Sequence, residues 1–147
     1  MDNVVVGIKA GLIGGFAWGG IESILPEIII HFGVFGNLST VGYPLQFGSS
    51  VLSASLLIPL VMCVLGIIGG IIFGTIFAAI HDKIPGKSGK TKGVYYSLII
   101  WLISNVSGLF GAIYTYGLIL YIGSSFTANL VFGLILGTLF EGGIEKH

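Results

Sequence analysis

The sequence predicts an all-α, polytopic membrane protein in which four transmembrane helices form two repeated helical hairpins. Apolar residues make up 54% of the 147 residues and charged residues only 8%, so a water-soluble domain of this length would not bury its own hydrophobic surface. Four stretches have the roughly 20 mostly apolar residues that a helix needs to cross a bilayer. The octet Gly70-Ile-Ile-Phe-Gly-Thr-Ile-Phe77 also returns, little changed, as Gly133-Leu-Ile-Leu-Gly-Thr-Leu-Phe140.

The expected spans follow the uncharged stretches of the chain. The last two form nearly one continuous apolar run, which is too long for a single crossing. We place the break near Gly111–Gly117, because the octet repeat maps the start of the second span onto Tyr114; a break at Gly123-Ser-Ser125 is the main alternative. The four spans are then Val4–Ile30, Val51–Ile80, Gly93–Gly111 and Tyr114–Phe140.

Residues 1–147 form a single transmembrane domain in this interpretation. The first hairpin covers residues 1–83 and the second covers residues 92–147, and the loop 81–92 joins them. A cleaved signal peptide is the alternative for the first span. It has less support, because the basic residue Lys9 lies inside the apolar region and no clear small-residue cleavage site follows.

The lysines predict the orientation. There is no arginine, and the six lysines lie at the N-terminal end, between the second and third spans, or at the C-terminal end. They are Lys9; Lys83, Lys87, Lys90 and Lys92; and Lys146. The positive-inside rule then places both termini and the loop 81–92 in the cytoplasm of a multi-pass cell-membrane protein. We expect the four loop lysines to attract anionic lipid headgroups, and no feature predicts nucleic-acid binding.

The segment His31–Ser50 is the longest connection and is expected on the outer side of the membrane. Its aromatic residues are expected at the outer interface, where a ring and a polar edge are both accommodated. A lid or a re-entrant turn is the alternative for this segment.

Small residues recur every four positions on three of the four spans. Residues four apart share a helix face, and in lipid such small residues let two backbones approach closely. The pattern therefore predicts tight helix packing, within the chain and in a homo-oligomer; the lining of a narrow pore is the alternative. The residues concerned are Gly7, Gly11, Gly15 and Gly19; Gly66, Gly70 and Gly74; and Ser125, Asn129, Gly133 and Gly137.

Glu22, Asn105 and Asn129 are the candidates for an intramembrane polar site. A second repeat, which aligns Lys9 with Lys92 and Trp18 with Trp101, also aligns Glu22 with Asn105 at equal depth. An ionised acid at such depth costs about 2.5–3.5 kcal/mol on insertion scales, so it marks a functional candidate by default. Two alternatives stay open. Pro26 ends or kinks the helix and leaves Glu22 within reach of water, and the amides serve only to join helices.

The sequence contains no residue pattern that is typical of an enzyme active site. The three histidines fall at span ends or at the terminus, so no pair is placed to ligate a haem. No Cys/His cluster offers a metal site, and no Gly-xxxx-Gly-Lys-Ser/Thr phosphate loop is present. The single cysteine, Cys63, excludes an internal disulfide. We therefore expect a protein that is not an enzyme and has no cofactor.

Three segments resemble the small YagU-like four-helix membrane proteins of unknown function. They are Lys9-Ala-Gly-Leu-Ile-Gly14, Lys92-Gly-Val-Tyr-Tyr-Ser-Leu-Ile-Ile-Trp-Leu102 and Asn129-Leu-Val-Phe-Gly-Leu-Ile-Leu-Gly137. The resemblance implies a four-helix integral membrane protein and no assigned activity or ligand. That group is expected to have a histidine where Asn129 stands, which weakens any role of this position that needs a titratable ring.

Two functions are compatible with these features. The first is a non-enzymatic membrane protein that self-associates, or acts as an accessory subunit of a membrane complex, through its glycine-rich helix faces. The alternative is a small transporter or channel with a polar constriction at Glu22 and Asn105. The two differ in the interior of the bundle, because a transporter needs a continuous polar path past Glu22 and a packing subunit has a dry interior.

Overall fold

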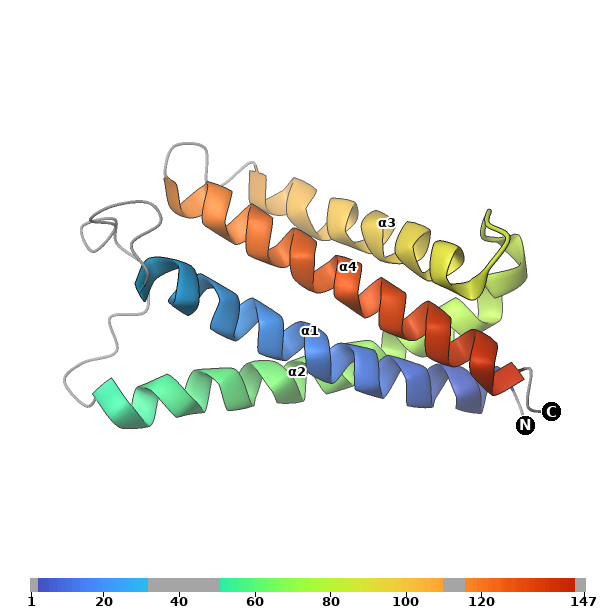
Figure 1. The fold of residues 1–147 in the computed structure, drawn as a ribbon, viewed down its shortest axis with the longest axis horizontal. Helices are drawn as coiled ribbons and strands as arrows, with labels where there is room; N and C mark the ends of the chain where they lie inside the picture. Colours follow the sequence, from blue (N-terminus) through green and yellow to red (C-terminus); the bar gives the residue numbers. More distant parts are fainter. Residues whose placement is uncertain (1–2, 32–50, 110–115, 145–147) are drawn as a thin grey trace.

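The computed structural model describes residues 3–31, 51–109 and 116–144, and the fold in these ranges is all-helical. Four long helices confirm that the fold is all-α (Figure 1). They are α1 (Asn3–His31), α2 (Val51–Ile80), α3 (Gly89–Leu109) and α4 (Tyr116–Ile144), with the short 3-10 helix η2 (His81–Lys83) after α2. The predicted outer segment 32–50 and the C-terminal Lys146 lie outside the described residues.

Apolar length is sufficient for membrane crossing in three helices of the described chain. The stretches Asn3–Leu25 in α1, Pro59–Lys83 at the end of α2 and Ile122–Ile144 in α4 are long and apolar enough to span a bilayer. Over its described residues, the 21-residue α3 is not among these spans. Its crossing of the membrane therefore stays a prediction.

The helix boundaries agree with the sequence where apolar runs end abruptly. The second helix has the predicted bounds, Val51–Ile80. The break between the last two helices falls between Leu109 and Tyr116, so the earlier of the two proposed breaks is confirmed. The alternative break at Gly123-Ser-Ser125 is wrong, because these residues continue α4.

The loop between the hairpins is shorter than the predicted range 81–92, because α3 begins at Gly89, four residues before the predicted start. Ser88 caps this helix: its Oγ accepts a hydrogen bond from the Thr91 amide at 3.3 Å. An N-cap serine satisfies one of the amides that a helix start leaves free. Gly86, with a φ of 146°, turns the chain just before the cap in a conformation that favours glycine.

Two antiparallel hairpins pack through α1 and α4 (Figure 1). The helix α1 contacts α2 on one side and α4 on the other, and α4 also contacts α3. The first residue of α1, Asn3, the last residue of α4, Ile144, and the connection through η2 lie at one end of the bundle (Figure 1). We call this end the terminal end. The positive-inside rule predicts that it faces the cytoplasm.

Glycines bring α1 and α2 into backbone contact. A methyl group added to Gly7, Gly11 or Gly15 would collide with a carbonyl oxygen of α2. The oxygens belong to Gly74, Gly70 and Gly66, respectively, and the α2 glycines meet α1 carbonyls in the same way. Each glycine thus turns a Cα hydrogen towards a facing carbonyl, a weak hydrogen bond that recurs where helices pack closely. These glycine faces are occupied within the chain.

The second hairpin has the same contact between α3 and α4. A methyl group on Gly89 would meet the Gly137 carbonyl, and one on Gly93 would meet the Gly133 carbonyl. The next residue of this face, Ser97, lies against Gly133 and is fully buried. The α3 partners were not among the predicted packing residues, although they repeat every four positions like the others.

The glycine contacts favour one of the two alignments of the predicted repeat. The octet repeat equates Gly74 with Gly137, so their contact partners, Gly7 and Gly89, are equivalent. The lysine and tryptophan repeat would instead equate Gly7 with Lys90, one residue further along α3. The packing of the helices follows the glycines, because they set the closest approach of the backbones.

Candidate intramembrane polar site

The predicted polar residues lie at one level of the bundle. Glu22 on α1 and Ser125 on α4 are each about 28 Å along their helices from the terminal end. Asn105 on α3 lies beside Ser125, and Asn129 follows one turn later on α4. The three helices α1, α3 and α4 therefore contribute to one site.

Ser125 is the centre of this site. Its Oγ accepts a hydrogen bond from Nδ2 of Asn105 at 3.4 Å, and its hydroxyl donates to the Glu22 carboxyl group. Ser125 and Asn105 are both buried. A chain of side-chain hydrogen bonds thus runs from α3 through α4 to α1. We call Glu22, Asn105 and Ser125 the polar triad.

Asn129 is buried but forms its hydrogen bond within its own helix. Its Nδ2 donates to the Ser125 carbonyl oxygen, one turn earlier, at 2.9 Å. Asn105 makes a similar bond to the Trp101 carbonyl at 2.9 Å, in addition to the bond with Ser125. Asn105 therefore joins two helices, whereas the observed donor bond of Asn129 is local.

Several polar atoms near the triad are buried without a hydrogen-bond partner. They are Oε2 of Glu22 and Nε1 of Trp18 and of Trp101. The ring of Trp101 packs edge-to-face against Phe126, with ring centroids 5.3 Å apart. Trp18 precedes Glu22, and Trp101 precedes Asn105, by one helical turn. These atoms leave hydrogen-bonding capacity for a small polar group.

An apolar layer lies between the polar triad and the terminal end. Phe77, Leu136 and Phe140 are completely buried, and Phe132 is nearly so. The ring of Phe77 packs edge-to-face on Phe140 at a centroid distance of 5.2 Å. Tyr96 of α3 closes the layer on one side, because its hydroxyl donates to the Phe73 carbonyl of α2 at 2.8 Å. Apolar side chains therefore fill the interior at this level.

Residues 1–145 match a protein family described as "Family of unknown function (DUF6789)". The chain belongs to this family. No curated protein and no solved structure matches the chain.

His81 and Cys63 of this DUF6789 protein lie outside the polar triad. No three His, Cys, Asp or Glu side chains of the described residues gather into a group that could hold a metal ion. His81 packs its ring on Phe140, with centroids 4.8 Å apart, and its Nδ1 pairs with Asp82 at 3.2 Å. Cys63 is a half-buried free thiol beside Gly20.

The arrangement changes one prediction about the site and adds one residue to it. Glu22 and Asn105 were expected to be equivalent residues of the repeat at equal depth, but the glycine contacts equate Glu22 with the exposed Ser104. Glu22 and Asn105 are instead linked through Ser125. The role of Ser125 was missed, although it precedes Asn129 by one helical turn on a face already recognised as continuous.

Proposed function

We propose that this DUF6789 protein is a non-enzymatic membrane protein that forms a rigid helical unit and associates with a second membrane protein, either another copy or a different subunit. The observation that carries the proposal is the closed apolar layer formed by Phe77, Phe132, Leu136 and Phe140. A closely packed apolar layer offers a solute no polar path, which supports a packing subunit over a transporter.

The glycine contacts change the surface through which association is expected. Gly11, Gly15, Gly66 and Gly70 already pack against one another within the chain, so they are not free for a partner. Among the described residues, the face of α2 that points away from α1 has no partner within the chain. The membrane-spanning stretch of α2 is also less buried than those of α1 and α4. It exposes Leu57, Leu60, Val61, Val64, Leu65, Ile68, Ile72 and Ile76.

Site-specific photo-crosslinking in native membranes tests this proposal. A benzophenone side chain is introduced at Ile68 or Ile72 on α2, and at Ile99 or Ile103 on α3 as matched controls, because all four side chains are exposed and apolar. We expect a protein adduct of one defined mass from the α2 positions only. Mass spectrometry of that adduct distinguishes a second copy from another protein.

Adducts with lipid alone from both helices, together with a monomeric mass in lipid nanodiscs, would contradict the proposal. Leucine at Gly15 or Gly70 is not a suitable probe of association, because it would disrupt the hairpin itself. The photo-crosslinking positions avoid this problem, since they lie outside the α1–α2 contact.

The polar triad favours a second candidate function, a small channel or transporter for protons or monovalent cations. An ionisable residue inside a membrane bundle commonly marks an ion or proton pathway. Glu22 is placed for this role, since one of its carboxyl oxygens is buried without a hydrogen-bond donor. The apolar layer would have to open for conduction to occur.

Proteoliposomes with an internal pH-sensitive dye test this candidate under a potassium diffusion potential. If Glu22 carries protons, the wild-type protein dissipates an imposed pH gradient, and Glu22→Gln reduces the rate at least tenfold. Glu141→Gln is the matched control, because Glu141 lies near the end of α4, against Gly89 and away from the triad. A wild-type rate equal to that of empty liposomes would exclude proton conduction.

A further inference from the structure

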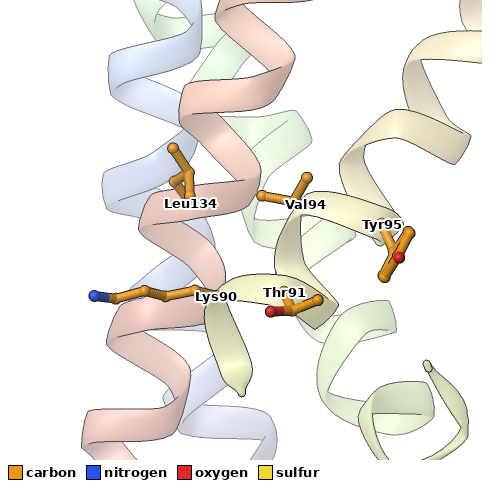
Figure 2. A pocket seen from close by; sticks show the side chains of 5 residues that line it. All are labelled: Lys90, Thr91, Val94, Tyr95 and Leu134. Carbon is orange, nitrogen blue, oxygen red and sulfur yellow. The ribbon is translucent and has the colours of Figure 1, made fainter. Parts of the chain in front are cut away.

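A groove of about 340 Å³ lies between the first turns of α3 and the facing side of α4. Figure 2 shows its five lining residues, with the Lys90 side chain extended across α4 and Val94 on the side of α3 towards Leu134. The lining consists of Lys90, Thr91, Val94, Tyr95 and Leu134. The groove is open to the surroundings of the bundle, so a ligand would enter it from the membrane side.

The groove changes from polar to apolar along α3. The Lys90 ammonium and the Thr91 hydroxyl lie in the first turn, and Val94 and Leu134 supply an apolar wall further along. Tyr95, with 48% of its surface exposed, adds a ring and a hydroxyl at the transition. Aromatic residues with a polar edge favour this depth in a bilayer. A phospholipid has its groups in the same order: an anionic phosphate, then glycerol esters, then acyl chains.

Lys90 differs from the other lysines of the connection. Lys83 and Lys87 are exposed outside the groove, and the stem of Lys92 packs against the turn at Gly86. Within the described residues, Lys90 has no carboxylate at ion-pair distance, so its charge is available to an anion. A lysine whose stem lies on apolar surface with its ammonium at the interface is well placed to hold a headgroup.

We propose that this groove binds one anionic phospholipid, with the Lys90 ammonium on the phosphate and the acyl chain along Val94 and Leu134. The proposal rests on α3 crossing the bilayer, and it assigns to one lysine a role that was predicted for all four loop lysines.

Native mass spectrometry of the full chain tests this site. Phosphatidylglycerol is titrated against phosphatidylcholine for the wild type and for Lys90→Gln, with Lys87→Gln as the matched control. We expect the wild type and Lys87→Gln to retain one phosphatidylglycerol. For Lys90→Gln, we expect about fivefold lower affinity, the equivalent of about 1 kcal/mol per lysine near an anionic surface. Leu134→Trp, which fills the apolar wall without changing charge, is expected to reduce retention as well.

Equal loss of lipid in Lys90→Gln and Lys87→Gln would overturn the proposal, because it would indicate diffuse attraction to the membrane surface. Competition by inorganic phosphate would also overturn it, since the site would then recognise a free anion and not a lipid. An Ile103→Cys variant tests separately whether α3 lies in the bilayer. Ile103 has 69% of its surface exposed, so a water-soluble maleimide should label this cysteine only if α3 is outside the membrane.

Discussion

The carbonyl oxygen of Gly70 occupies the place where a side chain on Gly11 would begin. The two helices of the first hairpin therefore touch through their backbones, and no larger residue fits at either position without separating them. The same relationship holds between Gly93 and Gly133 in the second hairpin. Backbone contact of this kind is the means by which helices associate in lipid, where no hydrophobic force joins them.

Gly70→Ala is expected to lower the free energy of unfolding by about 1–3 kcal/mol, the usual cost of overpacking. Its added methyl group would meet the Gly11 carbonyl and lie 2.8 Å from the Gly15 Cα. The neighbouring Gly69→Ala is the control, because a methyl group there meets only a Phe73 ring carbon at 3.9 Å. This change should be neutral or stabilising, since alanine favours a helix by about 1 kcal/mol over glycine. Unfolding of the purified protein by sodium dodecyl sulfate measures both, and equal effects would contradict the packing described.

Tyr96→Phe is expected to destabilise the protein by about 0.5–1.5 kcal/mol, because it removes the hydroxyl that donates to the Phe73 carbonyl. This hydrogen bond joins α3 to α2. Without it, α2 contacts mainly α1. Tyr95→Phe is the matched control, since Tyr95 is half-exposed and faces the groove. The same detergent unfolding measurement applies. If Tyr96→Phe lowered the free energy of unfolding no more than Tyr95→Phe does, the proposed role of the Tyr96 hydroxyl would be contradicted.

The hydrogen bond between Asn105 and Ser125 predicts an energetic coupling between α3 and α4. In a double-mutant cycle of Asn105→Ala and Ser125→Ala, we expect a coupling of about 0.6 kcal/mol, the average for such bonds in membranes. A cycle of Asn105→Ala with Thr127→Ala provides the baseline, because Thr127 is exposed and donates to the Gly123 carbonyl of its own helix. Equal coupling in both cycles would mean that the polar triad does not join the helices.

The predicted orientation is tested by labelling with a membrane-impermeant maleimide in a Cys63→Ala background. Lys87 is exposed and belongs to the connection between η2 and α3, which lies at the terminal end (Figure 1). We therefore expect Lys87→Cys to react only after the membrane is permeabilised. Ser39→Cys, in the segment predicted to lie outside, is expected to react in intact cells. Labelling of Lys87→Cys from outside would reverse the orientation and would place the lysines against the positive-inside rule.

The sequence was sufficient for features that depend on local composition. The bounds of α2 follow from an apolar run that ends at Ile80 before His81 and Asp82. The break before α4 follows from the octet repeat. The early start of α3 was also predictable in principle, since Ser88 has the N-cap chemistry that begins a helix. It was missed because the lysines of the first turn were assigned to the loop.

Contacts between helices were less predictable. The small-residue periodicity showed which face of α1 would pack closely, but only the structure shows that Gly11 meets Gly70 and not a second copy of the chain. The correspondence of Glu22 with Asn105 failed for the same reason. A one-residue change of alignment rotates a helix position by about 100°, and the lysine and tryptophan spacing could not reveal which alignment the backbone contacts use.

Composition and the period of single helices were enough to predict a helical, mostly apolar chain and to identify the glycine faces and the few polar residues. Only the packing of the helices shows that Ser125 links Glu22 to Asn105, that Phe77 packs on Phe140 in the interior, and that Lys90 borders the groove between α3 and α4. These relationships join residues that are far apart along the chain. They depend on which helix faces are neighbours, and helical periodicity contains no information about that choice.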